Sequence, residues 1–178
     1  MMNSPEPFYV TPAPGTLPMT DTLELAQRAA VVAEAESWVG TPYRQLGATK
    51  GVAVDCGMLL VRAWVDAGIF EPFDPRPYPP EWHLHKPEER YLRWVETMAE
   101  EVAVPQPGDI VLFQFGRCFS HGGIMVAAER LVHANAAWKS CSYGDLFEAQ
   151  LALMRSGAPR PRRFFSVWDK MRRLGGVA

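Results

Sequence analysis

The chain has 178 residues, of which 48% are hydrophobic and 21% charged, and its net charge at neutral pH is −2. This composition is typical of one globular domain with its own core and argues against a disordered or fibrous protein. No apolar run reaches the roughly 18–20 residues that a membrane helix needs, and the N-terminus lacks the basic start and apolar stretch of a secretory signal.

The first third of the chain predicts an irregular arm followed by two helices. Residues 1–19 contain five prolines and show no periodicity. A capping-box pattern begins at Asp21, and apolar residues at helical spacing continue from there until Gly40 interrupts them. A second helical pattern covers about 55–68.

The middle of the chain is rich in proline and aromatic residues. Residues 71–87 contain six prolines together with Phe73, Tyr78 and Trp82. We expect an extended surface loop, because proline has no N–H to donate and fixes its own backbone. A helical pattern over 88–101 follows the loop.

The second half of the chain has a strand-like pattern. We predict strands near 109–115, 122–128, 130–135 and 163–168, with a short helix near 145–155. Helices first and an antiparallel sheet second make an α+β domain, which we place at 20–169.

The C-terminal part is basic. From Arg155 onward there are seven basic residues and one acidic residue. We interpret residues 170–178 as a solvated basic tail, and docking to a partner or an anionic polymer is the alternative.

Cys56 is the first candidate for chemistry. The three cysteines, Cys56, Cys118 and Cys141, are an odd number, so at least one must be free. Cys56 follows a glycine-containing loop and begins an apolar helical segment, which places it at a helix N-terminus. There the unpaired N–H groups and the helix dipole stabilise a thiolate, so we expect a lowered pKa and rapid alkylation near neutral pH. A cysteine that only packs the helix is the alternative.

Two later histidines are candidate partners for this thiol. His121 precedes two glycines, which leave room for a substrate backbone, and a cysteine followed much later by a histidine is the chain order of papain-like thiol hydrolases. His133 and Asn135 compete as the group that orients His121, and a purely structural histidine is the alternative for His133. A tight hairpin turning at 129–130 would pair His133 with about Val126. Contact with His121 would then need a bulge or side chains that lean together.

Tyr43 lies on the loop before the cysteine helix. Its hydroxyl can donate to an oxyanion, as can the backbone N–H of Cys56. A tyrosine that merely occupies a surface turn is an equal alternative.

Metal and nucleic-acid binding have weaker support. The residue types that could bind zinc are Cys118, His121, His133 and Cys141, with His83 and His85 in the proline-rich loop. Their spacing matches no common zinc pattern and leaves Cys56 unexplained. The sequence has no glycine-rich phosphate loop and no interleaving of basic and aromatic residues. We expect no metal, no cofactor and no nucleic-acid partner.

Five motifs together resemble the NlpC-type cell-wall cysteine peptidases in order and spacing. They lie at residues 40–44, 55–56, 107–113, 120–124 and 132–134. The resemblance covers roughly residues 22–168 and implies a papain-like α+β fold. It also implies hydrolysis of peptidoglycan stem peptides, typically between D-glutamate and diaminopimelate.

The resemblance assigns a role to each candidate. Cys56 would be the nucleophile, His121 the base and His133 the third catalytic residue. Tyr43 would assist the oxyanion, and Asp55 would contact the amino group of the substrate. The aromatic residues of the loop 71–87 would then form one wall of the substrate cleft, or alternatively cover only the helix that follows them.

Two local features refine this expectation. Residues 40–44 with the run 50–52 look most like the branch found in phage tails and gene-transfer agents, which implies synthesis in the cytoplasm and delivery with a phage-like tail. Gly57 departs from the family, which usually has a serine there that helps to hold the N-terminal alanine of the stem peptide. The alternatives are a catalytically silent structural protein of such a tail, docking through residues 1–19 and the basic tail, or an acyltransferase.

Overall fold

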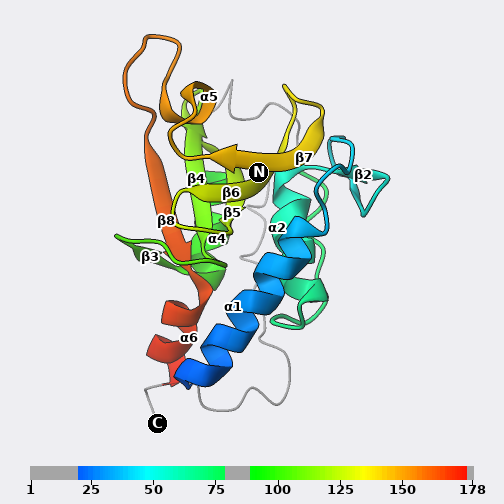
Figure 1. The fold of residues 1–178 in the computed structure, drawn as a ribbon, viewed down its shortest axis with the longest axis vertical. Helices are drawn as coiled ribbons and strands as arrows, with labels where there is room; N and C mark the ends of the chain where they lie inside the picture. Colours follow the sequence, from blue (N-terminus) through cyan, green and yellow to red (C-terminus); the bar gives the residue numbers. More distant parts are fainter. Residues whose placement is uncertain (1–19, 79–88, 176–178) are drawn as a thin grey trace, which may run out of the picture.

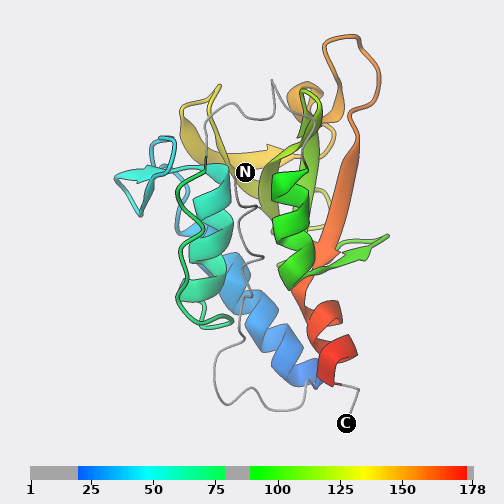
Figure 2. The same ribbon diagram turned by 180° about the vertical axis from the view of Figure 1, so that it is seen from behind.

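The computed structural model describes residues 20–78 and 89–175. Its helices are α1 (Asp21–Glu36), α2 (Cys56–Asp66), α4 (Arg90–Met98), α5 (Ala149–Ala152) and α6 (Val167–Gly175). The main sheet contains β3 (Glu100–Val102), β4 (Ile110–Phe115), β5 (Cys118–Met125), β6 (Arg130–Asn135), β7 (Ser140–Asp145) and β8 (Arg162–Ser166). A small separate sheet pairs β1 (Ala48–Thr49) with β2 (Ala53–Val54). Figures 1 and 2 show the helices and the main sheet from two sides, and the predicted α+β class is confirmed.

The strands of the main sheet follow the order β3-β8-β4-β5-β6-β7, and each pair of neighbours is antiparallel. The four predicted strands correspond to β4, β5, β6 and β8, although β5 begins earlier than expected, at Cys118. The sequence pattern does not predict β3 or β7. The strand formed last along the chain, β8, lies between β3 and β4.

Alternate residues of the central strands enter two different hydrophobic clusters. Ile110, Leu112 and Ile124 belong to the larger cluster, which includes buried residues of α1, α2 and α4. Val111 and Phe113 point to the opposite face, where a smaller cluster includes Leu151 of α5. Alternation of side chains along a strand explains this division. The start of α2 is therefore held against one face of the sheet.

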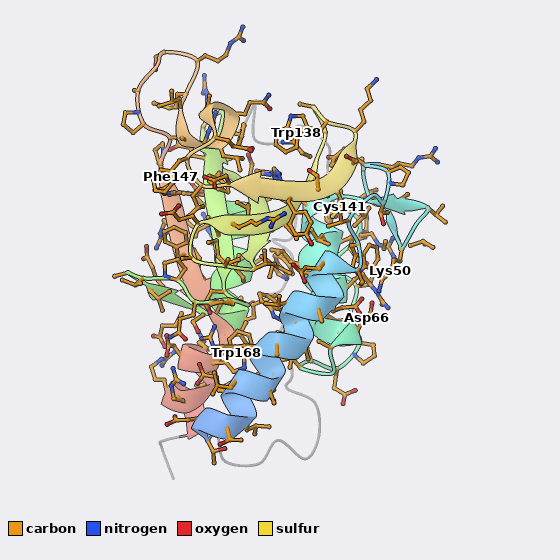
Figure 3. The ribbon with its side chains drawn as sticks, in the orientation of Figure 1. Lys50, Asp66, Trp138, Cys141, Phe147 and Trp168 are labelled. Atoms are coloured by element: carbon orange, nitrogen blue, oxygen red, sulfur yellow. The ribbon has the colours of Figure 1, made fainter. Side chains whose placement is uncertain are left out.

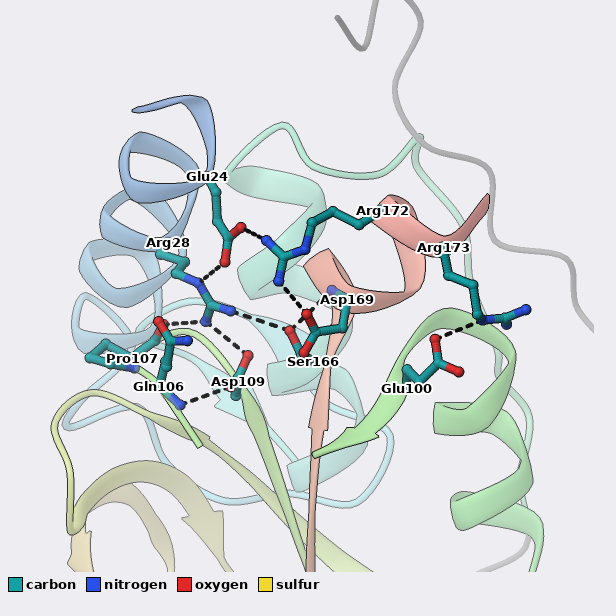
Figure 4. A network of polar contacts seen from close by, with 10 residues as sticks. All are labelled: Glu24, Arg28, Glu100, Gln106, Pro107, Asp109, Ser166, Asp169, Arg172 and Arg173. Carbon is teal, nitrogen blue, oxygen red and sulfur yellow. Dashed lines mark hydrogen bonds and ion pairs between the residues drawn. The ribbon is translucent and has the colours of Figure 1, made fainter. Parts of the chain in front are cut away.

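Helix α1 begins one residue earlier than the capping-box pattern suggested. The side chain of Thr20 accepts a hydrogen bond from the N–H of Leu23, so Thr20 and not Asp21 is the N-cap. The Glu24 carboxylate does not complete a capping box with Asp21. It instead forms ion pairs with Arg28 and Arg172, which belong to the buried network shown in Figure 4.

Arg28 is the centre of that network and is only 4% exposed. Its guanidinium donates to Glu24 at 2.7 Å, to Asp109 at 2.8 Å, to the carbonyl of Pro107 at 2.9 Å and to Ser166 at 3.2 Å. It also lies over the ring of Trp168, at 4.1 Å from the ring centroid (Figure 3 places Trp168 beside α1). The network ties α1 to the turn before β4 and to the junction of β8 and α6.

The basic C-terminal segment differs from the solvated tail that the sequence predicts. Residues from Val167 form helix α6, and its cations contact acidic or carbonyl groups of the domain. Arg173 pairs with Glu100 at 2.7 Å, Arg172 pairs with Asp169, and Lys170 donates to the carbonyl of Glu96 at 2.9 Å. The positive charge of this segment is therefore largely used within the molecule.

Some sequence predictions concern residues outside the described part. These are the irregular arm at 1–19, Trp82 with the two loop histidines His83 and His85, and the last residues, 176–178. Across the described ranges, no helix combines the length and the apolar character that a lipid bilayer would require.

Candidate active site

The segment that carries Tyr43 is held as an additional strand beside β7. The N–H of Gly40 donates to the carbonyl of Cys141, and the N–H of Cys141 donates to the carbonyl of Thr41. The N–H of Tyr43 then donates to the carbonyl of Lys139 at 2.8 Å. This pairing fixes Tyr43 beside the β6–β7 hairpin, which also carries His133.

Asp55 caps the helix that begins with Cys56. One carboxylate oxygen accepts from the N–H of Met58 at 2.8 Å, and the other accepts from the N–H of Leu46 at 2.7 Å. The carboxylate is almost fully buried, with 2% of Asp55 exposed. This N-cap places Cys56 on the first turn of α2, as the sequence predicts.

The thiol of Cys56 meets β5 at residues 120–122. It donates to the carbonyl of Ser120 over 3.9 Å, and the N–H of Gly122 donates to the sulfur. Burial, and next the charge of Asp55, raise the pKa of Cys56 to about 12. The expected lowering of this pKa is therefore wrong for the unliganded molecule, because the capping carboxylate lies at the helix end whose dipole would stabilise a thiolate.

His121 and His133 contact each other directly. The Nε2 atom of His121 lies 2.8 Å from the Nδ1 atom of His133. Asn135, the competing orienter, instead accepts a hydrogen bond from the N–H of Ala137 at 2.8 Å. Of the two candidates, His133 is therefore the one bonded to His121.

The register of β5 and β6 explains this contact. Ile124 pairs with Val132 and Met125 with Leu131, so the same register places His133 opposite Gly123. The predicted pairing with Val126 is wrong, because the connection between the strands is longer than a tight turn and closes where Val126 donates to the carbonyl of Arg130.

Gly123 is needed for this approach of the two strands. A Cβ atom on Gly123 would lie 2.9 Å from the carbonyl oxygen of Val132 and 3.1 Å from Cβ of His133. Since alternate residues share a face, His121 lies diagonally across from His133 on the same side of the sheet, within reach of a ring.

Both imidazoles lie in an apolar setting. Burial lowers the pKa of His133 to about 4, and burial together with the neighbouring His133 lowers the pKa of His121 well below its usual range. Rings of Phe115 and Trp138 contact the pair edge-on, with centroids 5.5 Å from His121 and 5.1 Å from His133 respectively. The Nε2 atom of His133 is buried and has no hydrogen-bond partner among the described residues. Both histidines are therefore neutral near pH 7.

Three tyrosine hydroxyls surround the start of α2. Tyr91 donates to the carbonyl of Cys56 at 3.2 Å, and Tyr78 donates to both carboxylate oxygens of Asp55 at 2.7 Å. The hydroxyl of Tyr43 is bonded to the Gln45 side chain at 3.3 Å. Burial is the main cause that raises the pKa of all three phenols, so each keeps its proton.

Sequence reasoning assigned no role at the site to Tyr91, which it read only as part of the apolar face of a helix. The signal that could have singled it out is chemical: a buried tyrosine hydroxyl needs a hydrogen-bond partner, and Leu or Phe would serve a purely apolar face better.

The proline-rich loop contacts both predicted neighbours. Tyr78 lies at the start of α2 through its bonds to Asp55, which confirms that this part of the loop packs beside the cysteine helix. Phe73 instead packs on α4, with its ring centroid 6.4 Å from that of Trp94. Whether the loop lines a substrate cleft stays a prediction.

The residue types that could bind zinc do not form a metal site. Over residues 20–78 and 89–175, no group of three His, Cys, Asp or Glu side chains is arranged to hold a metal ion. Cys118 and Cys141 are buried as free thiols in the body of the domain.

A cysteine on the first turn of a helix, packed against an antiparallel sheet that carries a histidine pair, defines a papain-like α+β protein. The sequence profile of the NlpC/P60 family matches residues 40–152, more than half of the chain. The chain belongs to the NlpC/P60 family.

Solved structures with the same fold include peptidoglycan hydrolases. The NlpC/p60 domain of the peptidoglycan hydrolase SagA is 19% identical with a TM-score of 0.53, over 78% of this chain and 97% of that one. The peptidoglycan hydrolase RipB of Mycobacterium tuberculosis is 13% identical with a TM-score of 0.56, over 84% of this chain and 68% of that one.

A third similar structure belongs to a longer protein. It is an NLP/P60 family protein of Staphylococcus aureus described as similar to a lipoprotein, 21% identical with a TM-score of 0.52. The match covers 78% of this chain but 41% of that one, so this chain spans less than half of its length. Among curated proteins, none matches the sequence significantly.

Proposed function

We propose that this protein is a cysteine peptidase that hydrolyses peptidoglycan stem peptides, at the bond between D-glutamate and diaminopimelate. Membership of the NlpC/P60 family and the fold shared with SagA and RipB support cell-wall hydrolysis as the broad activity. The observation that carries the proposal is the 2.8 Å contact between His121 and His133 on the sheet that Cys56 adjoins.

In the proposed reaction, His121 takes the proton of the Cys56 thiol as the sulfur attacks the scissile carbonyl carbon. Since the thiol has a raised pKa and the imidazole a lowered one, the pair rests in the neutral form, and transfer accompanies attack. His133 accepts a hydrogen bond from His121 and stabilises the imidazolium that forms.

The tetrahedral oxyanion would be bound by two donors. The N–H of Cys56 is one of the free donors at the start of α2, and the Tyr43 hydroxyl is the second. His121 then gives its proton to the departing amine, and the C–N bond breaks to leave a thioester on Cys56. Water, deprotonated by His121, attacks this thioester and releases the free carboxylate and the thiol.

The sequence variant at residues 40–44 and 50–52 supports one further part of the proposal, delivery with a phage-like tail. Copurification of the protein with purified tail particles, detected by mass spectrometry, would test it. Freely released protein that is absent from such particles would count against it.

Incubation of the protein with defined muropeptides, followed by mass spectrometry, tests the activity and the cleaved bond together. We expect two products that differ from the substrate by one water and separate D-glutamate from diaminopimelate. The matched control is Cys56→Ala, which should fold and cleave nothing. Cleavage by folded Cys56→Ala would refute the mechanism, and a folded wild-type protein that cleaves no muropeptide would favour a structural protein with the same fold.

A further inference from the structure

Gly57 and Tyr78 share one small space beside the nucleophile. A Cβ atom on Gly57 would lie 3.1 Å from the hydroxyl oxygen of Tyr78 and 3.6 Å from a carboxylate oxygen of Asp55. The missing side chain at position 57 is therefore replaced by a hydroxyl group that comes from the proline-rich loop, 21 positions further along the chain.

The loop is fastened where it carries Tyr78. The Arg76 guanidinium donates to the carbonyl of Leu46 at 2.8 Å and to Asp74, also at 2.8 Å through its Nε atom. Leu46 in turn donates its N–H to Asp55. The contacts of Arg76 hold the loop against the same segment that positions the Asp55 carboxylate, so Tyr78 has a defined place at the site.

Asp55 itself is poorly placed to meet a ligand. Its two oxygens already accept from Met58, Leu46 and the Tyr78 hydroxyl, and 2% of the residue is exposed. No lysine, arginine or histidine of the described ranges donates to it, so its negative charge has hydrogen-bond donors but no bonded cation. Buried carboxylates without such a partner favour a nearby positive charge.

Tyr78 is half-buried and can transmit that preference. A phenol has one hydrogen to donate and two lone pairs that accept. Because its hydrogen points to Asp55, the oxygen keeps its lone pairs for another donor, and donation to a carboxylate makes that oxygen a stronger acceptor.

We propose that Tyr78 is a specificity-determining residue, whose hydroxyl oxygen accepts a hydrogen bond from an ammonium group of the substrate next to the scissile bond. In a stem peptide this group is the free N-terminus of the alanine that precedes D-glutamate. The inference rests on the proposed function for its substrate. It differs from the expectation that Asp55 contacts the amino group directly, because Tyr78 covers the carboxylate.

Binding to the Cys56→Ala protein tests this without requiring turnover. The two probes are the tripeptide L-alanyl-γ-D-glutamyl-diaminopimelate and the same peptide with an acetylated N-terminus, and calorimetric titration gives the two Kd values. We expect the free amine to bind at least about tenfold more tightly, since hydrogen bonds to charged groups are the stronger ones. Tyr78→Phe should bring the ratio of the two Kd values close to one by weakening only the free-amine peptide.

Two further variants separate recognition from structure. Tyr143→Phe removes a hydroxyl that is bonded to Glu36, away from Cys56, and should keep the full ratio. Gly57→Ala leaves Tyr78 intact but presses on its hydroxyl, and it should lower the ratio as Tyr78→Phe does. This second variant serves also if Tyr78→Phe proves unstable.

The outcomes distinguish the two proposals. A Tyr78→Phe protein that keeps the full ratio, or that loses affinity equally for both peptides, would overturn the role of Tyr78. Equal Kd values for the two peptides in the Cys56→Ala protein would overturn it as well. A wild-type protein that cleaves neither peptide would refute only the proposed function, because the binding ratios would still decide the role of Tyr78.

Discussion

The Nε2 atom of His121 and the Nδ1 atom of His133 are 2.8 Å apart and share one proton. If His121 donates this proton, its Nδ1 atom is free to accept the thiol proton of Cys56, and His133 carries its own proton on Nε2. That Nε2 atom is buried without a partner among the described residues, so the arrangement retains an unsatisfied polar atom in order to keep His121 a base.

His133→Leu should therefore lower kcat/KM for a muropeptide by about 100-fold or more, mainly through kcat, because the imidazolium of His121 loses its acceptor. His133→Asn provides an amide oxygen and should lose less. Steady-state kinetics of both variants measure the difference. A His133→Leu protein within a few-fold of wild type would show that the contact has no catalytic role.

Protonation of His133 should destabilise the fold in mild acid. The pKa of His133 is about 4 in the native state, below the ordinary value of 6.5 for an exposed histidine. Between these values the unfolded chain binds the proton and the native state does not. The free energy of unfolding should thus fall as pH drops from 6.5 to 4, by up to about 1.4 kcal/mol per pH unit from this group. Urea unfolding across this range should give a shallower slope for His133→Asn, and equal slopes would contradict the assignment.

Alkylation of Cys56 should be slow at neutral pH and accelerate with pH. Because its pKa is about 12, the thiolate fraction rises roughly tenfold per pH unit between pH 7 and 10. The rate of iodoacetamide labelling, followed by mass spectrometry, should follow this slope. Cys56→Ala is the control, since Cys118 and Cys141 are buried. A rate that is already at its plateau near pH 7 would instead support a stable thiolate.

Loss of the buried guanidinium at Arg28 should be severe. Arg28→Met leaves the buried carboxylates Asp109 and Glu24 without their shared cation, and removing one partner of such a pair costs about 3–5 kcal/mol. Arg62→Met removes the exposed ion pair with Asp66 and should cost less than about 1 kcal/mol. Denaturant unfolding of both variants checks the contrast, and similar losses would mean that the network contributes little.

Gly108 and Gly157 both have positive φ angles, +91° and +82°, but differ in surroundings. A Cβ atom on Gly108 would lie 2.8 Å from the ring of Trp168, whereas Gly157 has open space. Gly157→Ala should cost about 1–2 kcal/mol of backbone strain, and Gly108→Ala should add a further 1–3 kcal/mol, roughly, from overpacking. Thermal unfolding that ranks the two variants in the opposite order would contradict this account.

The sequence predicted α1, α2 and α4 well because each has an apolar face at helical spacing. It could not predict β7, whose residues Ser140, Ser142 and Gly144 are small or polar and are held by backbone pairing to β6. Helix α6 was equally inaccessible, since cationic residues conceal its helical pattern until their carboxylate partners are known.

The candidate residues at the site were predictable by type, whereas their contacts were not. The contact between His121 and His133 depends on the length of the connection after Val126, and a slip of one residue would turn either ring to the other face. The position of Tyr78 depends on where the proline-rich loop crosses Asp55, which no local pattern encodes.

The placement of β8 between β3 and β4 has a consequence for biosynthesis. A ribosome that has made the chain up to residue 161 has produced Cys56, His121 and His133, but β4 still lacks the neighbour on its outer side. Arg28 and Asp109 would likewise wait for Ser166 and Trp168 to enclose them. The nascent chain therefore holds its candidate catalytic groups before it holds the framework that orders them, and the domain can reach its native form only once the segment through α6 has left the exit tunnel.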